Sequence, residues 1–131
     1  MLRALCALFL TLAMASAHAQ NPPAGALWNA DKTAAVASSH QGNRATVIAY
    51  VRQKDGSFST IDLSRIEGGA LGQLGRPRSD YERLETTATE WIPRSDGLLQ
   101  LEFRIRAWRK GQRYTVHEPL VFHPDGRVIW R

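Results

Sequence analysis

The alternation of apolar and polar residues over positions 98–108 constrains this chain more than any other feature. In LLQLEFRIRAW (98–108), one face of an extended strand would carry Leu99, Leu101, Phe103, Ile105 and Ala107. The opposite face would carry Gln100, Glu102, Arg104, Arg106 and Trp108. A period of two is typical of a strand with one buried and one solvated face. The segment therefore predicts an antiparallel strand.

Short glycine-containing turns separate this strand from its neighbours. Lys110-Gly111 and Asp125-Gly126 are two-residue turns that lead into RYTVHEPLVFH (113–123) and RVIW (127–130). A turn at Lys110-Gly111 places Ile105 opposite Val116, so apolar side chains meet across the hairpin. Upstream, the sequence predicts strands over 45–52, 57–64 and 81–92, with turns at 54–56 and 95–97.

Two segments do not show a strand pattern. Residues 29–40, NADKTAAVASSH, fit either a short alanine-rich helix or a weak strand, and the alanines favour the helix. Residues 65–80 are rich in glycine and predict a loop, with a helical turn near 70–74. We interpret this loop as a crossover between hairpins, with a functional loop as the alternative.

The predicted fold is mainly β. We expect an antiparallel meander sheet of about 5–7 strands, strongly twisted or closed into a partial barrel, with at most one short N-terminal helix. The domain organisation predicted is a signal peptide over 1–19, an N-terminal lead segment with a short helix over 20–44, and an antiparallel β domain over 45–131.

The first 19 residues, MLRALCALFLTLAMASAHA, have the features of a cleavable signal peptide. Arg3 precedes an apolar run, and Ala17-His18-Ala19 is a small-x-small cleavage site before Gln20. The run is about 12 residues, whereas a membrane span needs roughly 20. Cys6 lies too early to be the lipidated cysteine of a lipoprotein. We therefore predict a periplasmic or secreted protein.

Cleavage would change the composition of the chain. It removes Cys6, which is the one cysteine, and Arg3, which leaves 16 of the 17 basic residues against 12 acidic ones. A domain without disulfides suits the bacterial periplasm. No second apolar segment of spanning length follows, so we expect no stable membrane insertion after cleavage.

Arginines gather on the polar face of the C-terminal hairpin. Arg104, Arg106 and Trp108 share this face with Arg113 and His117 of the next strand. The simpler interpretation is a solvated face whose arginines pair with Glu85, Glu90 or Glu102. The functional interpretation is a strip that binds an anionic partner. Export argues against nucleic acid as that partner.

Glu90 and Glu118 could form a pair of carboxylates on the apolar face of the predicted sheet. The predicted register places Glu118 opposite Phe103, and a two-residue turn at Asp96-Gly97 would place Glu90 on the other side of Phe103. Paired carboxylates can hydrolyse glycosides. Two alternatives are favoured over such a pair. A bulge at Pro119 would turn Glu118 outward, and a three-residue loop over 95–97 would turn Glu90 outward and Trp91 inward.

The sequence contains no recognisable catalytic or metal motif. It has no Gly-x-Ser-x-Gly segment, and His117 and His123 would lie roughly 20 Å apart along one strand. We predict no catalytic residues, no metal and no cofactor. The leading hypothesis is an exported, non-catalytic periplasmic binding protein that engages a protein or an anionic envelope polymer through the arginine strip and loop 65–80. The alternatives are a small-ligand carrier with an apolar β-barrel cavity and, less favoured, a hydrolase using Glu90 and Glu118.

Overall fold

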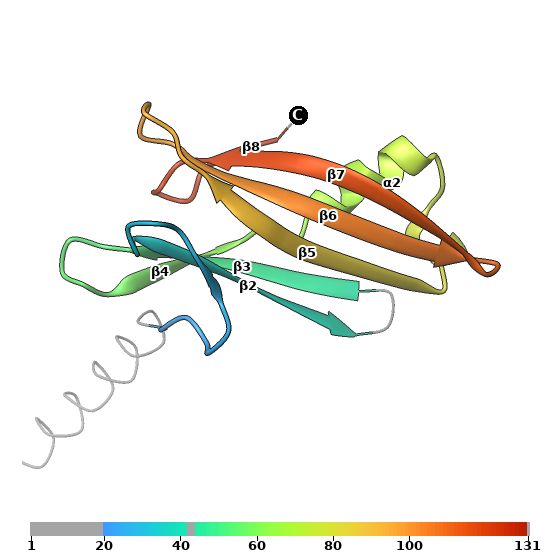
Figure 1. The fold of residues 1–131 in the computed structure, drawn as a ribbon, viewed down its shortest axis with the longest axis horizontal. Helices are drawn as coiled ribbons and strands as arrows, with labels where there is room; N and C mark the ends of the chain where they lie inside the picture. Colours follow the sequence, from blue (N-terminus) through green and yellow to red (C-terminus); the bar gives the residue numbers. More distant parts are fainter. Residues whose placement is uncertain (1–19, 42–43, 131) are drawn as a thin grey trace, which may run out of the picture.

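Two antiparallel sheets and one helix make up the structure, a computed structural model that describes residues 20–41 and 44–130 (Figure 1). The first sheet contains β1 (Leu27–Trp28), β2 (Ala34–Gln41), β3 (Arg44–Arg52) and β4 (Phe58–Asp62). The second contains β5 (Arg83–Ile92), β6 (Leu99–Arg109), β7 (Gln112–Phe122) and β8 (Val128–Ile129). Helix α2 (Ile66–Leu74) and a short 3-10 helix, η1 (Arg78–Asp80), connect the sheets.

The mainly β class and the antiparallel pairing are confirmed, whereas the single meander is wrong. Strands neighbour each other in chain order within each of two four-stranded sheets, and the described residues form no closed barrel. The chain changes sheet where α2 interrupts the run of strands (Figure 1). Because each sheet has one apolar face, stacking two sheets buries both faces without closing a barrel.

The N-terminal helix is also wrong. Residues 34–41 form β2, which pairs with β3 along its whole length, from Ala34 opposite Val51 to Gln41 opposite Arg44. Ala34 and Ala35 are fully buried, so their small side chains fit a tightly packed position and tertiary packing overrides the helix propensity of alanine. The helix of the structure lies at 66–74, and the helical turn predicted near 70–74 is its C-terminal part.

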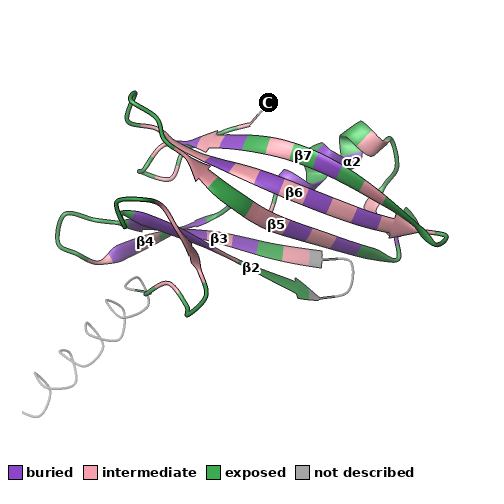
Figure 2. Cartoon of the chain, in the orientation of Figure 1, coloured by how far each residue is buried: buried purple, intermediate pink, exposed green. Residues whose placement is uncertain are grey.

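The register predicted for the C-terminal hairpin is confirmed. Ile105 lies opposite Val116, and Leu99 opposite Phe122. The turn residues Lys110 and Gly111 both have positive φ, at 51° and 75°, which a two-residue hairpin turn requires. Burial alternates along β6 as expected, with inward residues buried and outward residues half-buried (Figure 2).

Strand β5 contains a β-bulge that the sequence did not predict. Ala88 pairs with Phe103 and Glu90 pairs with Glu102, so Thr89 is an additional residue between them. Ile92 lies opposite Gln100, the register that a three-residue loop over 95–97 produces. The three-residue loop, one of the two alternatives to a catalytic pair, is therefore observed. The two-residue turn that would place Glu90 beside Phe103 is not observed.

A shared core fills the space between the sheets. Strands β2 and β3 lie against β5, and α2 lies against β7 (Figure 1). Side chains from both sheets and from the helix form one cluster, which includes Val47, Leu63, Ile66, Phe103 and Phe122. Trp91 closes one end of this core, because its ring lies 6.1 Å from that of Phe122 and its Nε1 donates to the Leu27 carbonyl at 2.9 Å.

The predicted signal peptide, residues 1–19, lies outside the described residues. Within the part of the chain that the structure describes, no helix has the length and apolar character needed to cross a membrane.

Candidate functional site

The outer face of the second sheet, which points away from the core, collects basic side chains from three strands. Strand pairing arranges them in rows: Arg83, Trp108 and Arg113; Glu85, Arg106 and Thr115; Thr87, Arg104 and His117. We call the six residues Arg83, Arg104, Arg106, Trp108, Arg113 and His117 the basic face. The five residues predicted from the sequence therefore do lie together on one side of the sheet.

Three arginines of the basic face have no carboxylate partner. No described carboxylate oxygen lies within 4.0 Å of the guanidinium nitrogens of Arg104, Arg106 or Arg113. The predicted pairing with Glu85, Glu90 or Glu102 is absent, because Glu85 binds Arg83 at 2.8 Å instead. The Nε atom of Arg104 is buried and has no hydrogen-bond partner. Arg113 is exposed and Arg104 and Arg106 are half-buried, so their guanidinium donors other than this Nε stay available for an external anion.

An aromatic ring lies at one end of the basic face. The guanidinium carbon of Arg83 lies 4.5 Å from the centre of the Trp108 ring, and Arg113 is the partner of Trp108 on β7. Arginine stacks readily on such a ring while its N–H groups stay free at the edge. Arg83 was missed in the sequence analysis, because its position opposite Trp108 depends on the bulge in β5.

Loop 65–80 does not join the basic face. Its helix α2 lies on the inner side of the second sheet, where Thr86 Oγ1 donates to Glu67 at 3.1 Å and Gln73 Nε2 donates to Glu118. The sequence hypothesis grouped the loop with the arginine strip as one contact surface. The structure places them on opposite sides of the sheet.

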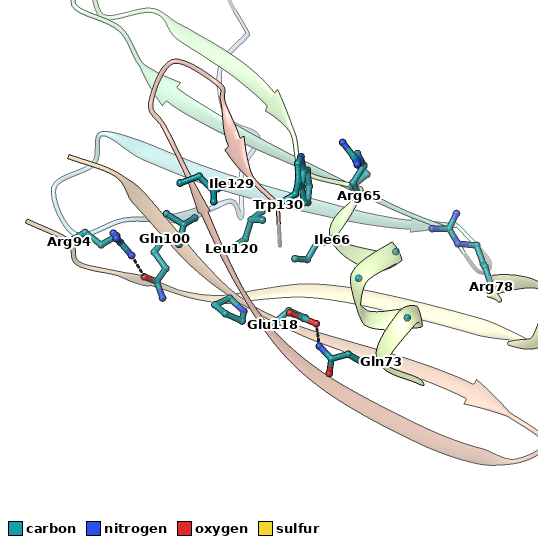
Figure 3. A pocket seen from close by; sticks show the side chains of 16 residues that line it. Arg65, Ile66, Gln73, Arg78, Arg94, Gln100, Glu118, Leu120, Ile129 and Trp130 are labelled. Atoms are coloured by element: carbon teal, nitrogen blue, oxygen red, sulfur yellow. Dashed lines mark hydrogen bonds between the residues drawn. The ribbon is translucent and has the colours of Figure 1, made fainter. Parts of the chain in front are cut away.

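A groove of about 980 Å³ runs between α2 and the β7–β8 edge of the second sheet (Figure 3). Its walls combine glycines of α2, apolar side chains near the C-terminus and several polar groups. The residues that line the groove include Arg65, Gly68, Gly69, Gly72, Arg78, Arg94, Glu118, Leu120, Ile129 and Trp130. Within the groove, Arg94 Nη1 donates to Gln100 at 2.7 Å.

A polar network centred on the buried residues Glu67 and Thr86 links α2, β5 and β2. Glu67 is 1% exposed, binds Arg78 at 2.5 Å and accepts a hydrogen bond from Thr86. The backbone N–H of Thr86 in turn donates to His40 Nε2 at 2.6 Å, which joins β2 to β5. Burial raises the pKa of the Glu67 carboxyl, and Arg78 and the Thr86 hydroxyl oppose that shift. No motif in the sequence indicated this network.

The two glutamates considered for hydrolysis lie on opposite faces of the sheet. Glu118 pairs with the inward-facing Phe103, so the bulge proposed at Pro119 is not observed, whereas Glu90 pairs with the outward-facing Glu102. The arrangement needed for a catalytic pair is therefore absent. Within the described residues, no group of His, Cys, Asp and Glu side chains could hold a metal ion.

No protein-family model, curated protein or solved structure matches this chain.

Proposed function

We propose that this chain is an exported, non-catalytic binding protein that uses its basic face to hold an anionic polymer of the bacterial cell envelope. One observation carries the proposal. Arg104, Arg106 and Arg113 have no carboxylate within 4.0 Å in the described chain. Cross-strand pairs of opposite charge stabilise a sheet face, and these three arginines lack such pairs, which leaves their charge available to an external anion.

The shape of the basic face supports a polymer rather than a compact ligand. Side chains on one face of a strand recur about every 6.7 Å, so Arg104 and Arg106 are successive contacts along one line. Arginine binds carboxylate and phosphate groups bidentately. An extended chain of regularly spaced anionic groups can therefore meet several guanidinium groups at once, with Trp108 as an apolar contact at the end of the row.

The other candidate functions have less support. A carrier needs an enclosed cavity, but the described strands form no closed barrel, and Phe103, Phe122 and Leu63 occupy the space between the sheets. A hydrolase that pairs Glu90 with Glu118 needs both carboxylates on one face. The pairing of these residues places them on opposite faces.

Reversal of two charges on the basic face tests the proposal. We expect Arg104→Glu combined with Arg106→Glu to weaken binding to a phosphate polymer and a carboxylate polymer by at least about tenfold. Both side chains are half-buried on the face away from the core and have no described carboxylate partner, so the melting temperature should stay within about 2 °C of the parent. Polyphosphate and polygalacturonate serve as probes, and binding is measured by calorimetry at several salt concentrations.

The matched control is Arg52→Glu with Lys54→Glu, which makes the same change in net charge on exposed residues at the β3–β4 turn. The control should retain binding. Equal loss in both variants would mean that only net charge matters. If the protein captured an acidic envelope protein and bound neither polymer, the ligand of the basic face would be a protein and the polymer proposal would be wrong. Unfolding of the double variant would assign the arginines a structural role.

A further inference from the structure

The groove between α2 and the β7–β8 edge lies on a different part of the molecule from the basic face. Its apolar wall contains Leu120, Ile129 and Trp130, and Ile129 is 38% exposed. It is the only large hydrophobic side chain in the exposed class within the described residues. The wall therefore offers apolar area to an occupant.

The guanidinium group of Arg65 lies against this apolar wall. The guanidinium carbon of Arg65 lies 4.8 Å from the centre of the Trp130 ring (Figure 3). Two other arginines of the groove already bind carboxylates, Arg78 that of Glu67 and Arg94 that of Asp96. Arg65 has no described carboxylate within 4.0 Å. Stacking on Trp130 leaves its N–H groups directed to the side, where they can bind an anion.

The opposite wall is formed by α2, where three glycines leave the helix backbone uncovered between the side chains of Ile66 and Gln73. Gly68, Gly69 and Gly72 line the groove, and a Cβ atom added at any of them would meet nothing within 4 Å. These positions thus leave room for an occupant to lie close to the helix. Next to them, β8 pairs only with Val121 and Phe122, so the outer edge of β7 from 112 to 120 has no partner strand in the described chain.

We propose that this groove binds an extended segment of another protein in which an acidic side chain lies next to an apolar one. The carboxylate would bind Arg65, the apolar side chain would contact Ile129 and Trp130, and the backbone would lie along α2 beside the open edge of β7. Charge complementarity favours this occupant. Among the described residues that line the groove, Arg65 is a cation without a carboxylate partner and lies beside apolar area, and the carboxylate of Glu118 already accepts a hydrogen bond from Gln73.

A peptide selection tests the proposal while the natural partner is still unidentified. A displayed library of random heptapeptides is selected on the purified protein and counter-selected on a Gly69→Leu variant, whose new side chain would occupy part of the groove beside α2. This variant should fold at least as well as the parent, because Gly69 is helical and has space for a side chain. We expect the surviving peptides to carry Asp or Glu beside Leu, Ile or Phe.

Variants then identify the contacts of the selected peptide. Arg65→Gln should weaken binding at least about tenfold, and exchange of the acidic residue of the peptide for its amide should have the same effect. Arg65→Lys should recover only part of the affinity. The double variant Arg104→Glu with Arg106→Glu should bind the peptide normally, and Gly69→Leu should bind polyanions normally. The two proposals can therefore fail separately.

Two results would overturn the inference. One is a selection that yields no peptide specific for the parent protein, or only peptides without an acidic residue. The other is equal affinity of the selected peptide for the parent and for Arg65→Gln, which would place the contact elsewhere.

Discussion

Glu67 shows how a single residue connects the parts of this molecule. It is the only buried charged side chain within the described residues, and it joins α2 to Thr86 of β5 and to Arg78 of η1. Burial raises the pKa of its carboxyl above the ordinary value of 4.5. The protonated form is therefore favoured in the folded state more than in the unfolded chain.

This shift determines the sign of a pH dependence. The stabilisation from a raised pKa is fully present below pH 4.5 and decreases as the pH rises through the folded-state pKa. Glu67→Gln removes this titration, so the free energy of unfolding should fall less steeply with pH in the variant than in the parent above about pH 4.5. Urea denaturation across this range measures both curves. Parallel curves would mean that Glu67 does not titrate differently in the folded and unfolded states.

For single residues, the sequence predicted which way side chains point but not which partners they bind. The inward position of Phe103 and the outward position of Arg104 follow from alternation in β6. The buried network of Glu67 could not be predicted, because it forms only when α2 is placed against β5. The absence of a partner for Arg106 likewise depends on which arginine Glu85 binds, and the sequence allowed several choices.

Helix α2 has a low intrinsic stability. Three of its nine residues are glycine, and glycine in a helix interior costs about 0.5–1 kcal/mol relative to alanine. Its position depends on burial of Ile66, Ala70 and Leu71 against the sheets. The sequence predicts a loop here because glycine is frequent and only three apolar side chains of the helix face the core.

Alanine at one of these glycines should stabilise the protein. Gly68 is exposed and helical, and a Cβ added there would meet nothing within 4 Å. Gly68→Ala is therefore expected to raise the free energy of unfolding by about 0.5–1 kcal/mol. The matched control is Gly75→Ala at the end of the helix, where φ is 76° and alanine should destabilise. Chemical denaturation compares the two, and a loss of stability at Gly68 would contradict the described geometry.

The whole molecule contains two sheets that depend on the same core. Val47 of the first sheet, Phe103 of the second and Ile66 of α2 belong to one buried cluster. The sequence predicted antiparallel strands with one apolar face, but it could not predict how many sheets they form. That number depends on contacts between strands far apart in the chain, such as β2 and β3 with β5.

A shared core predicts that both sheets unfold together. Phe103→Ala should destabilise the molecule by about 3–5 kcal/mol and Val47→Ala by a smaller amount, and each should lower a single thermal transition. Calorimetry with tryptophan fluorescence can follow this, since Trp28 lies in the first sheet and Trp108 in the second. The exposed Thr60→Ala is the control and should change stability by less than about 0.5 kcal/mol. Two separate transitions would show independent sheets.

The bulge at Thr89 makes β5 tolerant of a change in length. The residues on either side of Thr89 already pair with neighbouring residues of β6, and Thr89 itself is exposed, donating from its hydroxyl to the Glu102 carbonyl at 3.1 Å. A chain shortened by that one residue would keep every other pair of the two strands, with Trp91 inside and Glu90 outside. Strand β6 has no such spare position, because it pairs without interruption with β7. Loss of one residue from β6 would move the side chains on one side of the deletion to the opposite face of the sheet and expose apolar side chains that are buried in the core.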